Sequence, residues 1–283
     1  MSQRTKSDNR MTVEFATGNL SNMAGCWSFL RWRRRNRIPL VLGTTFVLFL
    51  GFAFAQERSS HFDQRSARPD GNQPITTINE LRAPKAARGA VERAREAILK
   101  GNFPEAHKQL DRVLKAFPNY APALMLEGIV NAEEQNFAMA EQNLNAAIKA
   151  DPSYSPAYLQ LAAFDNDTGR YDDALRLLNR AMPLMPSSWL LYLELANADI
   201  GMREYQTALR HIERAEALQP RDLLSNARAS NTRAMMHLLK ACAFVGIGSQ
   251  IRARPEFEAA IEAEPNGEFA HYSRSALAQL ELP

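Results

Sequence analysis

Apolar residues in the C-terminal two thirds of the chain recur in pairs of short segments, and a polar turn separates the two segments of each pair. Two of these turns are Lys100-Gly-Asn102 and Thr168-Gly-Arg170. Within a segment the apolar residues recur near the 3.6-residue period of an amphipathic helix that buries one face. The pattern therefore predicts an all-α series of helical hairpins.

The hairpins repeat with a fixed period. Prolines recur every 34 residues, and a fifth follows after 45, which is one period plus 11. An alanine precedes each proline by twelve residues, and a residue as small as alanine or glycine precedes it by 24. Small residues let two helices approach closely, and a proline ends the second helix of each pair. The repeat-defining positions are Ala106, Pro118, Gly128, Ala140, Pro152, Ala174, Pro186, Ala208, Pro220, Ala253 and Pro265.

With these residues the chain resembles the tetratricopeptide-repeat (TPR) family. The resemblance covers residues 87–265 in five units, 87–120, 121–154, 155–188, 189–222 and 234–267. It implies a right-handed superhelical solenoid of antiparallel helix pairs, in which stacking buries faces that one hairpin leaves open. Residues 268–282 have the pattern of a capping helix, so that residues 86–283 form one domain.

The fifth unit departs from the pattern in two ways. An insertion, residues 223–233, precedes it, and two interpretations stay open. The insertion either lengthens a helix by about 16 Å or forms a loop. Pro255 lies within the second helix of this unit, so we expect that helix to begin late, near Arg254.

The charge is divided unevenly along the chain. Residues 1–85 carry 13 Lys and Arg against 6 Asp and Glu, whereas residues 86–283 carry 21 against 25. The repeat region is therefore acidic, with a net charge of −4, which argues against a nucleic-acid partner because phosphate binding needs clustered Lys and Arg.

The basic N-terminal region precedes a run of uncharged, mostly apolar residues. Five arginines lie within residues 31–37, and residues 38–55 carry no charge. Arginines stay on the cytoplasmic side, so residues 1–37 are expected there. Residues 38–55 are either a signal peptide cleaved after the small-x-small pair Ala53 and Ala55, or an anchor of about 27 Å that holds the chain in the membrane. Residues 56–85 have the composition of a disordered linker.

The repeat region is therefore expected outside the cytoplasm. It would be periplasmic or otherwise extracytoplasmic, soluble after cleavage or anchored with its N-terminus in the cytoplasm.

Candidate chemistry is sparse. No two of the five histidines lie three to five residues apart, so no helix presents a metal-binding pair. There is no glycine-rich phosphate loop and no nucleophile motif. No catalytic residue, metal site or cofactor is expected, and His107 and His211 are expected to face solvent.

The resemblance points to a binding role. In TPR proteins the first helices of successive units line a concave face that binds extended peptides or helices. Carried over by position, that groove consists of Val91, Arg95, Met125, Ile129, Leu159, Ala163, Leu193, Asn197, Ile200 and Leu238. It is largely apolar and carries no lysine of the kind that holds a partner's carboxylate in some family members.

We therefore predict a non-catalytic scaffold that binds other proteins. The alternatives are an accessory subunit of an envelope enzyme or of a secretion or assembly complex, and an enzyme whose site has no recognised motif.

Overall fold

The computed structural model describes residues 85–219 and 230–280, which form eleven α-helices. Pro220, residues 38–55 with Ala53 and Ala55, and nearly all of the linker lie outside these ranges. In the described ranges no helix is both long and apolar enough to cross a membrane. The helices are α4 (Lys85–Leu99), α5 (Phe103–Ala116), α6 (Ala121–Glu133), α7 (Phe137–Ala150), α8 (Ser155–Thr168), α9 (Tyr171–Ala181), α10 (Trp189–Met202), α11 (Tyr205–Leu218), α12 (Ser230–Gly246), α13 (Gln250–Ala263) and α14 (Glu268–Leu280).

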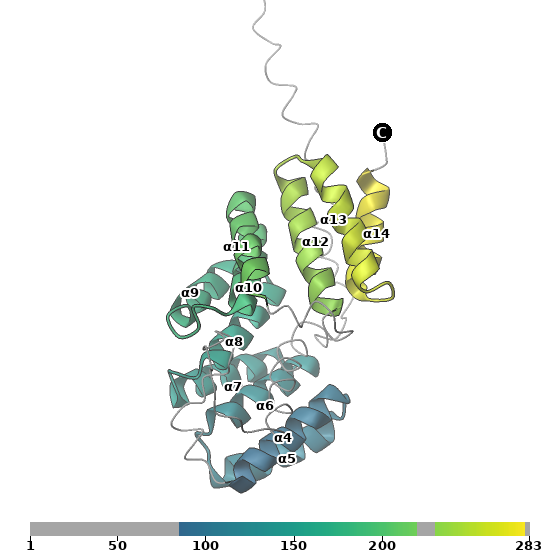
Figure 1. The fold of residues 1–283 in the computed structure, drawn as a ribbon. Helices are drawn as coiled ribbons and strands as arrows, with labels where there is room; N and C mark the ends of the chain where they lie inside the picture. Colours follow the sequence, from purple (N-terminus) through teal and green to yellow (C-terminus); the bar gives the residue numbers. More distant parts are fainter. Residues whose placement is uncertain (1–84, 220–229, 281–283) are drawn as a thin grey trace, which may run out of the picture.

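The helices pack in consecutive pairs that follow one another along an array (Figure 1). The first helices of the pairs, α4, α6, α8, α10 and α12, contact one another in sequence, and we call them the inner helices. Their partners α5, α7, α9, α11 and α13 are the outer helices. α14 packs against both α12 and α13 at the end of the array. The predicted all-α array of helix pairs is confirmed.

Small residues lie where the two helices of a pair cross. Ala106, Ala140, Ala174, Ala208 and Ala253 on the outer helices are fully buried. On the facing inner helix of the second unit, a Cβ added to Gly128 would lie 2.7 Å from Leu144 Cγ. A larger side chain at these positions has no room, which explains why the sequence keeps them small.

The turn inside each pair has one residue with left-handed backbone. Gly101, Gln135, Gly169, Arg203 and Gly248 have φ between 65° and 77°. The first four are spaced by the 34-residue period. Glycine adopts this conformation at no steric cost, whereas Gln135 and Arg203 carry a Cβ and are strained there.

The fifth pair differs from the expectation for Pro255. α13 begins at Gln250 and includes Pro255, so the predicted start near Arg254 is wrong. Proline at this position removes the N–H that would bond the carbonyl of Ile251. The Ile251 side chain is 91% exposed, so water can reach this side of the helix and the missing bond is tolerated. Upstream, α12 already includes Ser230, and residues 220–229 lie outside the described ranges.

At the last two junctions between consecutive pairs, an aromatic ring lies on a glycine. A Cβ on Gly201 of α10 would overlap the ring of Tyr171, the first residue of α9. A Cβ on Gly246 of α12 would overlap the ring of Tyr205, the first residue of α11. The ring of one outer helix thus covers bare backbone of the next inner helix, and this contact fixes the spacing of the units.

We therefore expect Gly201→Ala to destabilise the protein by about 1–3 kcal/mol, because the methyl group must displace the Tyr171 ring. The matched control is Gly89→Ala in α4, where the nearest atom to an added Cβ is an Arg93 guanidinium nitrogen at 3.5 Å. That change should stabilise the protein by about 0.5–1 kcal/mol, since alanine favours the helix. Equal effects in urea denaturation would show that the ring does not lie on Gly201.

Candidate functional site

The ten predicted groove residues lie on the five inner helices, but most of them are not open to solvent. The eight apolar members are at most 7% exposed, and only Arg95 and Asn197 are partly exposed. The sequence predicted an apolar surface here, whereas the folded chain buries these side chains. An open apolar groove is therefore not what the structure shows.

The burial follows from the composition of the inner helices. α6, α8 and α10 each bury eleven residues, distributed around the whole helix. The outer helices α7, α9 and α11 bury four, three and three, along one stripe. A helix that is apolar on all sides is buried on all sides, so the inner layer is the core of the array.

Most polar residues of α6, α8 and α10 have acidic or amide side chains. α6, α8 and α10 together carry six carboxylates and no lysine or arginine. Asn166 of α8 donates from Nδ2 to Glu194 Oε2 of α10 at 2.9 Å and to the Glu194 carbonyl at 3.1 Å. α6, α8 and α10 therefore combine many apolar side chains with carboxylates, whereas the inner helices α4 and α12 carry lysine and arginine.

One amide in this layer lacks hydrogen bonds. Gln160 of α8 is 1% exposed, and neither its Nε2 nor its Oε1 has a hydrogen-bond partner in the part of the chain that the structure describes. Glu194 lies 34 residues after Gln160, at the equivalent position of the next unit, and it is hydrogen-bonded to Asn166. One unit earlier, the residue equivalent to Asn166 is Ala132, which has no polar side chain that could bond Gln160. A buried polar group without a partner costs about 1–3 kcal/mol.

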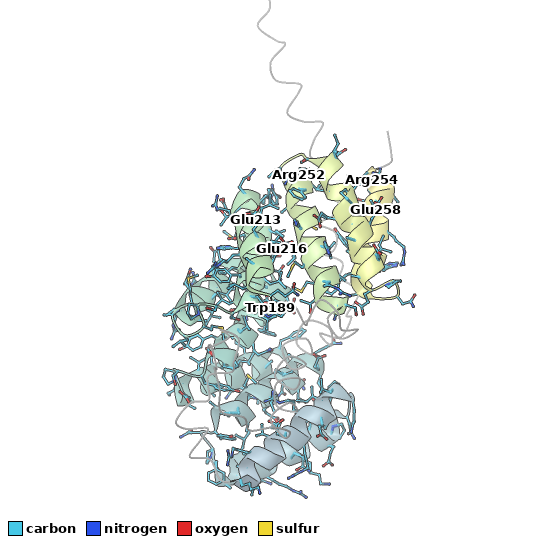
Figure 2. All side chains as sticks on the ribbon, viewed as in Figure 1. Trp189, Glu213, Glu216, Arg252, Arg254 and Glu258 are labelled. Atoms are coloured by element: carbon cyan, nitrogen blue, oxygen red, sulfur yellow. The ribbon has the colours of Figure 1, made fainter. Side chains whose placement is uncertain are left out.

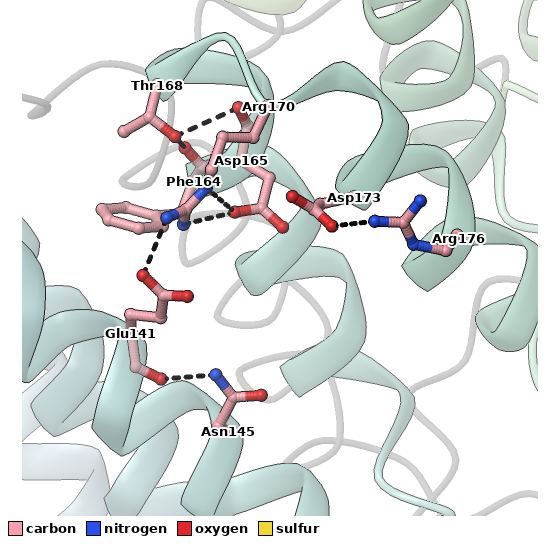
Figure 3. Close-up of polar contacts among 8 residues, drawn as sticks. All are labelled: Glu141, Asn145, Phe164, Asp165, Thr168, Arg170, Asp173 and Arg176. Carbon is pink, nitrogen blue, oxygen red and sulfur yellow. Dashed lines mark hydrogen bonds and ion pairs between the residues drawn. The ribbon is translucent and has the colours of Figure 1, made fainter.

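Arg170 links the second and third units (Figure 3). Its Nε donates to Asp165 Oδ1 at 2.8 Å, its Nη1 donates to Glu141 Oε2 of α7 at 2.8 Å, and its guanidinium lies 5.3 Å from the centre of the Phe164 ring. Asp165 is buried. Burial raises the pKa of this carboxyl to about 6, although Arg170 opposes the shift.

Three histidines pair with carboxylates of neighbouring helices. His107 Nδ1 lies 2.7 Å from Glu127 Oε1 and its Nε2 lies 3.0 Å from Glu134 Oε2. His211 Nδ1 lies 2.7 Å from Asp199 Oδ2, and His237 pairs with Glu256 in the same way. The side chains of His107 and His211 are partly exposed, at 29% and 25%, so each faces solvent on one side, as expected, and a carboxylate on the other. Burial opposes charge on His107, but its hydrogen bonds to Glu134 and Glu127 and their negative charges raise its pKa.

Metal-binding geometry is not found in residues 85–219 or 230–280. No group of three or more His, Cys, Asp or Glu side chains there is arranged to hold an ion. The thiol of Cys242 is buried on α12.

Comparison of the sequence with known protein families identifies the repeat that forms the helix pairs. Family models described as tetratricopeptide repeat match residues 91–155 and 131–188. Residues 91–188 of the chain therefore consist of tetratricopeptide repeats. No curated protein matches it with significance.

Solved TPR structures have the same fold. A thermophilic TPR protein of Thermus thermophilus superimposes with a TM-score of 0.55 at 18% identity, over 68% of this chain and 99% of that one. A TPR protein of Parabacteroides merdae gives 0.52 at 21% identity, over 68% and 71%. At this level of identity the likeness concerns the fold alone.

The raised pKa of Asp165 predicts a pH dependence of stability. Because its pKa is about 6 in the folded chain against 3.8 ordinarily, the fold disfavours the ionised form. The free energy of unfolding should therefore rise as the pH falls through 6, by up to about 3 kcal/mol from this group. His107 acts in the same direction, since its raised pKa gives stability that is lost as the pH increases through the folded value.

Urea denaturation at pH 7.5 and pH 5 isolates the contribution of Asp165. Asp165→Asn should gain less stability on acidification than the wild-type TPR domain does. Asp172→Asn, at an exposed carboxylate in the first turn of α9, should keep the wild-type dependence. The same gain in wild type and Asp165→Asn would contradict the assignment.

Proposed function

We propose that this TPR protein is a non-catalytic scaffold that binds a protein partner along its inner helices and works outside the cytoplasmic membrane. TPR domains generally bind proteins. The observation that carries the proposal is the contrast between the two layers. Outer helices are amphipathic and face water on one side, as in any two-layer array, whereas α6, α8 and α10 are apolar on the side away from their outer partners as well.

Apolar side chains on this side of α6, α8 and α10 are more stable in contact with a protein partner than in contact with water. Apolar area contributes roughly 25 cal/mol per Å² when it is removed from water. The partly exposed Asn197, together with Arg95, gives a partner a first point of contact. The buried residues around them would then exchange contacts within the chain for contacts with the partner.

The test of binding uses a residue that can be changed without loss of the core. Leu159 is unsuitable, since it is buried and a charge there would unfold the domain. A photo-crosslinking amino acid at Asn197 of the full chain, in its native cells, should form light-dependent adducts with a second protein. The same amino acid at Glu213, an exposed residue of α11 that Figure 2 labels, should form few. Adducts that form only at Glu213 would move the binding surface to the outer helices.

The proposed location is supported by the order of charge and apolar residues. Five arginines precede residues 38–55, and the chain after residue 55 would then cross outward. The apolar run acts either as a cleaved signal peptide or as an anchor, and the right-handed superhelix follows residue 85 on the outer side.

We expect that a reporter enzyme active only in the cytoplasm is silent when it is fused after Pro283. Strong activity of that fusion would place the TPR domain in the cytoplasm. Sequencing the N-terminus of the mature protein distinguishes cleavage after Ala55 from retention of the anchor.

A further inference from the structure

The charge of the chain changes sign after the first helix pair. Residues 85–116, which form that pair, carry eight Lys and Arg against four Asp and Glu, whereas residues 117–283 carry 14 against 21. The first pair thus has a net charge of +4, and the residues after it have a net charge of −7. Figure 1 shows α4 and α5 at one end of the array and α14 at the other. The basic charge is therefore concentrated at the end where the array begins.

Within the first pair, basic residues gather at the end of the hairpin that lies away from the turn at Gly101. α4 and α5 run antiparallel, and Arg93 Nε donates to Gln109 Oε1 at 3.1 Å, so residues 93 and 109 lie beside each other. Both helices rise equally per residue, so the start of α4 lies beside the end of α5. Residues 85–91 and 110–117 therefore share this end of the hairpin, and they carry four cations and one carboxylate. The cations are Lys85, Arg88, Arg112 and Lys115, and the carboxylate is Asp111.

The four cations and Phe117 form a surface that we call the basic end. All four cationic residues are exposed, and none of them forms an ion pair within the part of the chain that the structure describes. Phe117 follows the last residue of α5, and it is 39% exposed. Apolar area of this kind is more stable when it is removed from water. An aromatic ring among cations is typical of a surface that lies against lipid headgroups.

The order of the chain brings the basic end close to the membrane that residues 38–55 would enter. Residues 56–84 join the apolar run to Lys85, the first residue of α4. A chain of this length spans at most about 100 Å. The first pair is therefore the part of the array that is attached nearest to the bilayer, and the attachment raises the local concentration of the basic end at the lipid surface.

We propose that the basic end docks the array on a membrane surface that contains anionic phospholipid. Its cations lie among the headgroup phosphates, and the ring of Phe117 enters the boundary between the headgroups and the acyl chains. The same surface repels the negative charge of residues 117–283, so the first pair faces the bilayer and the later units point away from it. The proposal rests on the proposed location of the protein, and it does not depend on a partner along the inner helices.

Two other anionic partners fit the basic end less well. A nucleic acid carries dense negative charge along its whole length, and beyond the basic end it would meet the net charge of −7 of residues 117–283. An acidic protein segment would pair with the four cations, but it would give no role to the exposed ring of Phe117 or to the position of the basic end next to residues 38–55. The lipid surface accounts for all three observations.

The test uses the full chain in lipid nanodiscs, with a fluorescent amino acid at Asn119, an exposed residue two positions after Phe117. Discs of phosphatidylcholine are compared with discs that also contain phosphatidylglycerol, and both contain a spin-labelled lipid that quenches nearby fluorophores. Quenching should be at least about twofold stronger in the anionic discs and should decrease as salt is raised. The same fluorophore at Met139, which is 49% exposed on α7, should be quenched equally weakly in both. Equal quenching at Asn119 in the two kinds of disc would overturn the proposal.

Charge reversal connects the docking to the named cations. Each Lys or Arg near an anionic bilayer strengthens binding by about fivefold, so Arg88→Glu with Lys115→Glu should reduce the quenching to its value in phosphatidylcholine discs. Phe117→Ser should weaken the quenching while the charges stay unchanged. The matched control Arg176→Glu with Arg210→Glu, at exposed arginines of α9 and α11, should keep the wild-type quenching. If the first double variant fails to fold, Arg88→Gln with Lys115→Gln takes its place. Quenching that survives the loss of both charges would overturn the assignment.

Crosslinking in cells separates this inference from the proposed function. Equal quenching in the two kinds of disc, together with protein adducts at Asn197, would refute the lipid surface and leave the scaffold function intact. Stronger quenching in anionic discs without adducts at Asn197 would support the lipid surface and count against the inner helices as the binding site. A photo-crosslinking amino acid at Asn119 should form adducts with lipid. Adducts there with an acidic protein or a nucleic acid, and none with lipid, would refute the proposal.

Discussion

The array depends on how closely its helices approach one another. Within a pair the approach is set by fully buried alanines such as Ala106 and Ala174, and between pairs by an aromatic ring on the bare backbone of Gly201 or Gly246. The buried alanines recur in all five units, whereas the ring on glycine occurs at the junctions of the third pair with the fourth and of the fourth with the fifth. The strained left-handed turns at Gln135 and Arg203 show that backbone geometry is kept even where the side chain disfavours it.

The proposed binding concerns the side of α6, α8 and α10 that faces away from the outer helices. The outer helices cover one side of α6, α8 and α10, and the side that faces away from them is buried as well, since its apolar residues are at most 7% exposed. This side combines large apolar side chains with carboxylates and with the amide of Gln160, for which residues 85–219 and 230–280 supply no hydrogen-bond partner. A buried polar group without a hydrogen-bond partner lowers stability. The same face therefore accounts for the core and for the proposed site.

The fold could be predicted from the sequence because its determinants repeat. A single alanine carries little information, but alanine and proline at fixed distances in five successive units predict helix pairs and the residues at their crossings. Pro255 shows the limit of such rules, since one proline is tolerated inside α13 where the side chain of Ile251 faces water. The candidate site could be predicted only in part. Helical spacing assigned Leu159 and Leu193 to a face, but periodicity does not report what lies against that face, and both proved to be buried. Likewise, His107 meets Glu127 twenty residues away, a pair that follows from how two units are stacked and that local patterns do not contain.

Amide hydrogen exchange of the free full-length protein tests most directly whether the inner helices form the continuous core. Exchange reports the free energy of opening for each helix. The account predicts that the amides of α6, α8 and α10 exchange most slowly and at similar rates, and that those of α7, α9 and α11 exchange faster along their exposed faces. Inner helices that exchange as fast as the outer helices, or faster, would contradict it.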